Sequence, residues 1–367
     1  MMTHADQPPA FPLTTRADPM PEDARMALLA DPGFGRVFSD HMAMARWSTE
    51  KGWHDMGVVA RRPIELDPAT SVLHYAQEIF EGLKAYRAGD GAITLFRPDA
   101  NARRFRQSAV RMAMPELPDA LFLESVRALV RADREWLPAL EGGSLYLRPF
   151  MFASEVFLGV KPSAEYLYLV IASPAGGYFK SGSPSISVWV SEDFTRAAPG
   201  GTGAAKCGGN YAASLQAQAE AIREGCDQVV FLDAVERRQI EELGGMNLFF
   251  VFDDGSLATP PLTGTILPGI TRDSILTLAR DEGLVVREEH YAIDAWEADA
   301  RSGRLRETFA CGTAAVVTPV GRVRGRTHDF AIGNGGPGEI TSRLRDRLVA
   351  IQRGEAPDTH DWVQRIT

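Results

Sequence analysis

The chain has 367 residues, a formal net charge of −9, 45% hydrophobic residues and 24% charged residues. This composition is typical of a soluble globular protein, the length predicts two domains, and the acidic balance argues against a nucleic-acid partner, which would need a basic face. The three cysteines form no Cys-x-x-Cys pair and the seven histidines form no His-Glu-x-x-His motif, so neither a disulfide framework nor a metal site is expected.

Residues 1–30 are rich in proline and polar residues, and they predict a flexible arm. They lack the apolar core of a signal peptide, and no apolar run approaches a membrane span, which favours the cytoplasm. Residues 31–174 predict an α+β domain, because strands and helices mix without a strict alternation. Strands are expected at residues 72–75, 84–86, 93–96, 144–150 and 166–172, and helices at 98–112, capped by Asp99, and at 121–137.

Residues 175–185 are dense in glycine, serine and proline, and they predict an interdomain linker before a second domain at 186–367. The first helix of that domain, at 210–224, places Leu215, Ala219 and Ile222 along one side. Further helices are expected at 270–282 and 340–351, and strands at 186–190, 227–232, 247–252, 257–259, 308–310 and 315–320.

Lys206 lies in a run of small residues, with glycines at 200, 201 and 203 before it and at 208 and 209 after it. Little side-chain bulk crowds the backbone there, so the amine could reach a bound carbonyl and act as a nucleophile. The alternative is a solvated lysine in a flexible glycine loop.

Glu242 precedes two glycines and an apolar strand, where a carboxylate could be desolvated and hold a ring nitrogen in its protonated form. The alternative is an exposed acid at a strand start, and the neighbouring Glu241 could be that acid.

Residues 263–273 have the pattern of a phosphate cradle. Gly269 permits a tight turn, and Thr271 is a good cap for a helix whose first-turn amides and dipole favour an anion. The alternative is a capped helix without a ligand. The turn at 311–314, which contains Thr313 and Ala314, could hold an anion too.

Two arginines are candidates for binding anions. Arg104 lies early in the helix at 98–112, although one guanidinium is weak evidence in an arginine-rich chain. Arg148 alternates with apolar residues on a predicted strand, so it shares one face with Tyr146 and would need an anion if it points inward. An amine, a ring-nitrogen partner, a phosphate cradle and an anion-binding arginine together match pyridoxal phosphate and an amino-acid substrate.

The chain resembles the branched-chain amino-acid aminotransferases, which belong to the fold type IV group of pyridoxal-phosphate enzymes. The motifs that carry the resemblance are residues 34–35, 40–42, 73–75, 80–86, 95–98, 145–149, 206–211, 245–248 and 267–272. The resemblance implies a two-domain fold with a smaller N-terminal α/β sandwich and a C-terminal pseudo-barrel. We expect the site at the domain interface, where pockets often form. The resemblance also implies a homodimer, because in the family the Tyr75 position reaches into the neighbouring subunit's site.

The resemblance also implies the role of each matching residue. Lys206 matches the lysine that forms a Schiff base with pyridoxal 5'-phosphate and moves the proton. The other cofactor-binding positions are Glu242 at the pyridine nitrogen, Tyr211 at the phenolic oxygen, and Arg104, Ile270, Thr271 and Thr313 at the phosphate. The substrate-binding positions are Phe34, Tyr75, Tyr146, Arg148, Tyr178, Thr313 and Ala314.

The activity implied is a reversible ping-pong transfer of the amino group between leucine, isoleucine or valine and 2-oxoglutarate. Other fold type IV enzymes are the nearest alternatives, namely a D-amino-acid aminotransferase, an R-selective amine transaminase and aminodeoxychorismate lyase. A catalytically silent protein that binds pyridoxal phosphate is the alternative from another class, and the intact Lys206, Glu242 and Arg148 argue against it.

Overall fold

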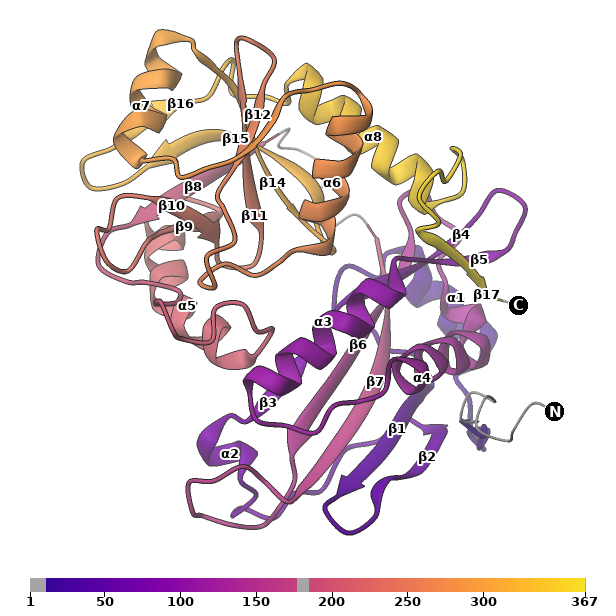
Figure 1. The fold of residues 1–367 in the computed structure, drawn as a ribbon. Coiled ribbons are helices and arrows are strands. Elements are labelled where there is room, and N and C mark those ends of the chain that lie inside the picture. Colours follow the sequence, from indigo (N-terminus) through magenta and orange to yellow (C-terminus); the bar gives the residue numbers. More distant parts are fainter. Residues whose placement is uncertain (1–10, 177–184, 367) are drawn as a thin grey trace, which may run out of the picture. The chain divides into compact units, whose positions relative to one another are not determined.

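The computed structural model describes residues 11–176 and 185–366. The chain divides into two compact units (Figure 1). The first unit comprises Met1–Tyr178, Ala205–Gly208 and Ile351–Thr367, and the second comprises Phe179–Ala204 and Gly209–Ala350. The short segment that carries Lys206 therefore belongs to the first unit, although it is flanked in sequence by the second.

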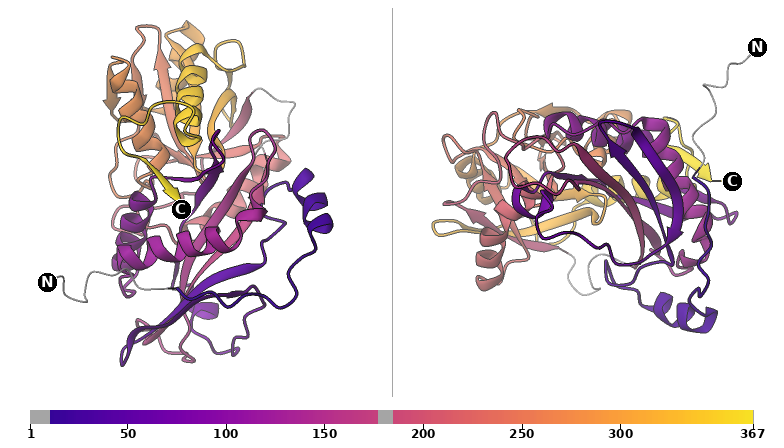
Figure 2. Two further views of the ribbon diagram at one scale, coloured as in Figure 1. Left: turned by 90° about the vertical axis from the view of Figure 1, so that its right-hand side faces the viewer. Right: turned by 90° about the horizontal axis from the view of Figure 1, so that it is seen from below.

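The first unit is built on an antiparallel sheet in the order β17-β5-β4-β6-β7-β1-β2, with β3 paired to β6 (Figures 1 and 2). Its strands are β1 (His41–Ser48), β2 (Gly52–Ala60), β3 (Glu78–Phe80), β4 (Leu83–Arg87), β5 (Ile93–Phe96), β6 (Ser144–Ala153), β7 (Glu165–Ala175) and β17 (Val363–Ile366). Its helices are α1 (Glu22–Ala30), α2 (Val72–Tyr75), α3 (Pro98–Arg111) and α4 (Asp119–Ala132), followed by a 3-10 turn at Arg134–Trp136.

Helices α3 and α4 cover one face of this sheet and bury its main core. Phe105 of α3 packs against Phe122 of α4 and against Tyr168 of β7, with ring centroids 5.5 and 5.6 Å apart. Side chains alternate along a strand, so Leu145 and Leu147 of β6 enter this core while the residues between them point to the opposite face. That alternation places the predicted site residues of β6 on the face away from α3 and α4.

The second unit contains a sheet in the order β10-β9-β8-β15-β14-β11-β12-β13, with β16 paired to β15. Its strands are β8 (Ile186–Ser191), β9 (Gln228–Leu232), β10 (Ile240–Leu243), β11 (Asn247–Phe252), β12 (Leu257–Thr259), β13 (Val286–Glu288), β14 (Leu305–Gly312), β15 (Val316–Arg324) and β16 (Asp329–Ala331). Its helices are α5 (Gly208–Arg223), α6 (Ile270–Asp281), α7 (Ile293–Ser302) and α8 (Glu339–Gln352).

This second sheet closes on itself. Strand β10 pairs with β9 and also with β11, through Glu242 and Asn247, so the strands from β9 round to β11 form a barrel-like ring. The predicted α+β fold, and the barrel-like second domain that the family resemblance implied, are thereby confirmed. Glu242 lies at the closure point of the ring, where β10 meets β11.

Several local predictions were wrong. Residues 72–75 form helix α2 rather than a strand, because their amides return to the carbonyls of residues 70 and 71 and most of their side chains are exposed. Residues 22–30 of the predicted flexible arm form α1, and Phe11 and Leu29 are buried in the core. The caps also differ, because α3 follows Arg97 in a left-handed conformation and α6 follows Gly269.

The domain boundary at the C-terminus differs from the predicted one as well. Residues 351–367 were assigned to the second domain, but β17 pairs with β5, and Val363 lies opposite Phe96. This antiparallel pairing joins strands that are far apart in the sequence, so no local sequence pattern predicts it. Within the described parts of the chain, none of the helices has the length and apolarity needed to cross a membrane.

Candidate active site

Lys206 is fixed through its backbone, while its side chain remains half-buried above an aromatic ring. Its N–H donates to Ser108 Oγ of α3 at 2.9 Å, and its carbonyl accepts from the Phe80 N–H at 3.0 Å. The ammonium nitrogen lies 4.7 Å from the centroid of the Phe80 ring. The rigid backbone and the partly accessible side chain are what a lysine nucleophile requires, and they disfavour the solvated, flexible alternative.

The loop that carries Lys206 is tied together at its base within the second unit. The Thr202 hydroxyl donates to Asn210 Oδ1 at 2.7 Å, and Asn210 Nδ2 donates to the Thr202 carbonyl at 2.8 Å. Gly203 lies against the backbone of Thr265, and a Cβ at that position would overlap the Thr265 carbonyl. The glycine at 203 therefore serves close packing of the loop rather than flexibility.

A buried carboxylate, Glu81, holds Arg104. Arg104 Nε and an Nη donate to the two Glu81 oxygens at 2.6 and 2.8 Å, and Asn101 Nδ2 adds a bond of 2.7 Å. Burial by itself would raise the pKa of Glu81, but Arg104, together with Lys206 and Asn101, lowers it overall. The bidentate ion pair with Glu81 therefore fixes the orientation of the Arg104 guanidinium and occupies its Nε and one Nη.

Tyr146 and Arg148 point to the face of the sheet that α3 and α4 leave uncovered. An Arg148 Nη donates to the Tyr146 hydroxyl at 3.0 Å, and the guanidinium lies 4.8 Å from the Phe80 centroid. Phe34 meets Tyr146 edge-on, with centroids 5.0 Å apart. Arg148 Nε is buried and makes no hydrogen bond within the described residues, so this guanidinium retains a donor for a ligand.

The remaining aromatic candidates do not join this cluster in the described structure. Tyr75 lies on α2, where it is 40% exposed, and its hydroxyl donates to the Leu158 carbonyl. Tyr178 lies outside the described residues.

Glu242 is deeply buried in the second unit, not exposed at a strand start. One carboxylate oxygen lies 2.7 Å from an Nη of Arg196 and accepts from the Leu267 N–H at 2.9 Å. The other accepts from Asn247 Nδ2 at 3.5 Å. Glu241 is also buried, bonded to the Thr265 hydroxyl, and burial raises its pKa. The Glu242 carboxylate thus faces one guanidinium and two N–H donors, a setting that suits an acid that pairs with a ring nitrogen.

The predicted phosphate cradle lies next to Glu242 in the same unit. Helix α6 begins at Ile270, directly after the segment whose Leu267 amide bonds Glu242, and Thr271 is buried in its first turn. A Cβ at Gly269 would overlap Asn247 Oδ1, so a larger residue there would require the Asn247 side chain to move. The N-terminus of α6 therefore presents its dipole close to the closure point of the ring.

The turn at 311–314 and the start of α5 also lie near the closure point of the ring. Thr313 and Ala314 occupy the half-buried turn between β14 and β15, and β14 pairs with β11 so that Cys311 lies opposite Asn247. Tyr211 lies on α5, where its ring would be 3.6 Å from a Cβ placed on Gly245. The structure thus brings Glu242, Tyr211, Thr313 and the start of α6 together around one end of the strands.

Four side chains that the sequence reasoning missed hold these groups in place: Glu81, Arg196, Asn247 and Ser108. Arg196, whose side chain is 1% exposed, also donates to the Thr265 carbonyl at 3.1 Å, and so links three segments. A lone arginine or serine gives no signal by itself in an arginine-rich chain. Glu81 lies within one of the motifs that carry the family resemblance, which was the one signal that could have singled it out.

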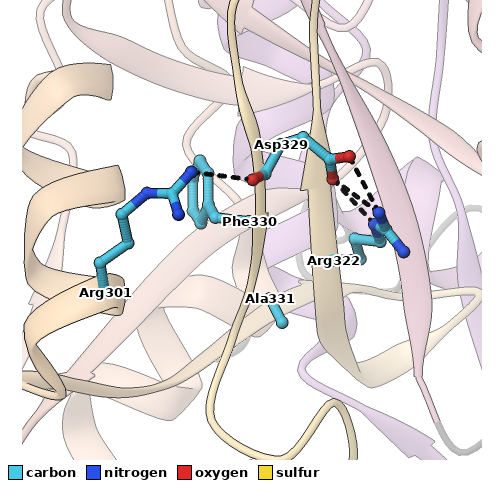
Figure 3. Close-up of a pocket in the computed structure, with 5 residues that line it drawn as sticks. All are labelled: Arg301, Arg322, Asp329, Phe330 and Ala331. Atoms are coloured by element: carbon cyan, nitrogen blue, oxygen red, sulfur yellow. Dashed lines mark hydrogen bonds and ion pairs between the residues drawn. The ribbon is translucent and has the colours of Figure 1, made fainter.

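A separate surface pocket in the second unit contains none of the predicted site residues (Figure 3). Its two arginines are already engaged by one residue. Arg322 donates twice to the Asp329 carboxylate at 2.9 Å, and Arg301 donates to the Asp329 carbonyl at 3.0 Å. The pocket is therefore a poor candidate for the amino-acid site.

Comparison with known proteins identifies the family of the chain. A family model described as amino-transferase class IV matches residues 78–323. The chain belongs to the class IV aminotransferases. A protein of Mycobacterium tuberculosis named branched-chain-amino-acid aminotransferase is 57% identical over 97% of this chain and 98% of its own length. A protein of Mycolicibacterium smegmatis with the same name is 55% identical over 98% of this chain and 99% of its own length.

Solved structures of branched-chain amino acid aminotransferases have a similar fold. The enzyme of Escherichia coli has a TM-score of 0.74 and 31% identity, covering 89% of this chain and 100% of that one. Another enzyme of that name, solved with pyridoxamine 5'-phosphate, has a TM-score of 0.70 and 28% identity, covering 89% and 99%. The class IV aminotransferases depend on pyridoxal phosphate.

The described residues fit that cofactor. Pyridoxal phosphate combines an aldehyde, a ring nitrogen and a phosphate, and needs an amine, an acid and an anion site. The half-buried lysine at 206, the buried carboxylate of Glu242 and the start of α6 have the matching chemistry.

Proposed function

We propose that this protein is a branched-chain amino-acid aminotransferase, which exchanges amino groups between leucine, isoleucine or valine and 2-oxoglutarate by a ping-pong mechanism. The likeness at 55–57% identity over nearly the whole chain to relatives of that name carries the proposal. The aromatic and cationic cluster of Phe34, Tyr146 and Arg148 supports it, since it offers an apolar wall beside one anion-binding group.

The cofactor-binding roles follow from the chemistry of each side chain. Lys206 would hold the aldehyde carbon, Glu242 the pyridine nitrogen and Tyr211 the phenolic oxygen, while Arg104, Ile270, Thr271 and Thr313 would hold the phosphate. When bound, the cofactor supplies an electron sink that stabilises negative charge at the α-carbon of the amino acid. Lys206 would remove the proton from that carbon, and its amine is poised to do so because the backbone on both sides is fixed.

The substrate pocket must accept both an aliphatic side chain and a carboxylate. Phe34, Tyr146 and Ala314 would contact the aliphatic group, with Tyr75 and Tyr178 completing the wall. Arg148 would bind the distal carboxylate of glutamate through its Nε donor, which has no acceptor within the described structure. A solved branched-chain amino acid aminotransferase that is 29% identical to this chain is a complex with N-(5'-phosphopyridoxyl)-L-glutamate, so a related enzyme binds a glutamate derivative.

Replacing Arg148 with alanine is expected to raise KM for glutamate and 2-oxoglutarate by about 10- to 100-fold, with a much smaller change for leucine. This range corresponds to the loss of one hydrogen bond between the Arg148 guanidinium and the substrate carboxylate. Steady-state kinetics on both substrate pairs test it, with Arg103→Ala, an exposed arginine of α3, as the matched control. Equal losses on both substrates would contradict the role of Arg148.

The function itself is tested by a half-reaction. Adding L-leucine to the cofactor-loaded protein, with no 2-oxo acid present, should convert its visible absorbance to that of the pyridoxamine form. The same titration with D-alanine and with aminodeoxychorismate provides the comparison. A faster response to either of these than to L-leucine would point instead to another class IV activity.

We also propose that the protein acts as a homodimer in the cytoplasm. Tyr75 and Leu158 lie side by side on the surface of the first unit, where they are 40% and 59% exposed. A contact with a second copy would cover them and would bring Tyr75 to the partner's site.

A further inference from the structure

Strand β3 places an acid, Glu78, on the same face of the sheet as the proposed carboxylate-binding arginine. Glu78 lies opposite Phe152 of β6, and Phe80 lies opposite Phe150. Side chains two residues apart share a face, so Glu78 and Phe80 project to the side on which Arg148 lies. The Arg148 guanidinium rests on the Phe80 ring, 4.8 Å from its centroid.

The Glu78 carboxylate interacts with Arg148 through charge without closing an ion pair with it. One of its oxygens accepts from the N–H of Gly208, two residues after Lys206. Burial raises the pKa of Glu78, while the Gly208 N–H and the charge of Arg148 oppose that rise because both favour the carboxylate. Arg148 itself donates to the neutral hydroxyl of Tyr146, and its buried Nε makes no hydrogen bond within the described residues.

This arrangement has opposite consequences for the two kinds of substrate. A leucine side chain brings no charge, so Glu78 is then the group that offsets the half-buried charge of Arg148. A glutamate side chain brings its own carboxylate, which Arg148 attracts and Glu78 repels. The charge of Glu78 therefore lowers the affinity of this pocket for glutamate relative to its affinity for leucine.

We propose that Glu78 is a specificity-determining residue whose carboxylate weakens binding of dicarboxylic substrates at Arg148 and favours branched aliphatic ones. This inference rests on the proposed function. Glu78 touches no reacting atom in this scheme, and its effect falls on KM rather than on kcat.

Replacing Glu78 with glutamine tests the charge, because the isosteric amide oxygen still accepts the hydrogen bond from Gly208. The ratio of kcat/KM for 2-oxoglutarate to that for the 2-oxo acid of leucine is expected to rise by about three- to tenfold. This is the size of effect expected when one like charge is removed several ångströms from the substrate carboxylate in a partly buried site. The change is expected in KM, with kcat nearly unchanged.

Two further variants separate the charge from other effects. Glu78→Asp keeps the charge and should retain a ratio near that of the wild type. Glu116→Gln removes an exposed acid from the same unit and should change nothing, which controls for net charge.

Equal changes in KM for both 2-oxo acids in Glu78→Gln, or the same altered ratio in Glu78→Asp, would overturn the proposal. If Glu78→Gln fails to fold, Glu78→Ala replaces it, and a ratio unchanged from that of the wild type would be the overturning result. The wild type must first transaminate leucine with 2-oxoglutarate. Absence of that turnover contradicts the proposed function, whereas a failure confined to the ratio contradicts only the role of Glu78.

Discussion

Replacing Lys206 with alanine is expected to lower kcat for leucine transamination by about 1,000-fold or more. The amine has two tasks in the proposed scheme, as the nucleophile that holds the cofactor and as the base at the α-carbon, and the second alone contributes about 10²–10⁴-fold. The backbone of residue 206 is held by Ser108 and Phe80, and alanine preserves both hydrogen bonds. The loss should therefore appear in kcat without a comparable loss of stability.

A chemical readout makes this result specific to residue 206. Wild-type protein reduced with borohydride in the presence of pyridoxal phosphate should carry the cofactor on the peptide that contains Lys206, and the alanine variant should not. Lys51→Ala, which removes an exposed lysine of the first unit, should keep both the adduct and the activity. An adduct on another lysine of the wild type, or an active alanine variant, would contradict the assignment.

The sequence was most informative where the signal was local. Strands β6 and β7 and helix α6 are apolar or periodic over their own length, and they lie close to the predicted ranges. The alternation along β6 also placed Tyr146 and Arg148 on one face, and the hydrogen bond between them confirms this. These features depend on neighbours within a few residues, which the sequence displays directly.

Interactions across long separations could not be read in this way. Glu242 meets Arg196, and Glu81 meets Arg104, because the topology brings distant strands and loops together, and nothing in either local pattern selects the partner.

Helix α5 illustrates the converse, a local pattern that the fold does not use. Periodicity predicts an apolar side with Leu215 and Ile222, yet both residues are exposed, and α5 packs through small residues such as Ala217 and Ala221. Small side chains permit close approach, and a count of large apolar residues does not detect them.

Replacing Glu242 with glutamine is expected to reduce the free energy of unfolding by about 3–5 kcal/mol, in addition to a large loss of activity, because removing one partner of a buried ion pair leaves the other charge uncompensated. The Glu242 carboxylate and the Arg196 guanidinium are 2% and 1% exposed and lie 2.7 Å apart. Urea denaturation of the cofactor-free protein measures the stability term separately from any loss of cofactor binding.

The neighbouring acid provides the matched comparison. Glu241 is also buried and precedes the same turn, but it accepts its hydrogen bond from the neutral Thr265 hydroxyl, so Glu241→Gln should cost less stability and leave kcat nearly intact. A double replacement, Glu242→Leu with Arg196→Met, removes both charges and should recover much of the stability, because well-packed apolar residues often substitute for a buried pair. It should not recover activity, since no carboxylate would then remain for the pyridine nitrogen. If the double variant regained activity along with stability, Glu242 would be only a structural partner of Arg196, and the electron-sink chemistry would need another acid.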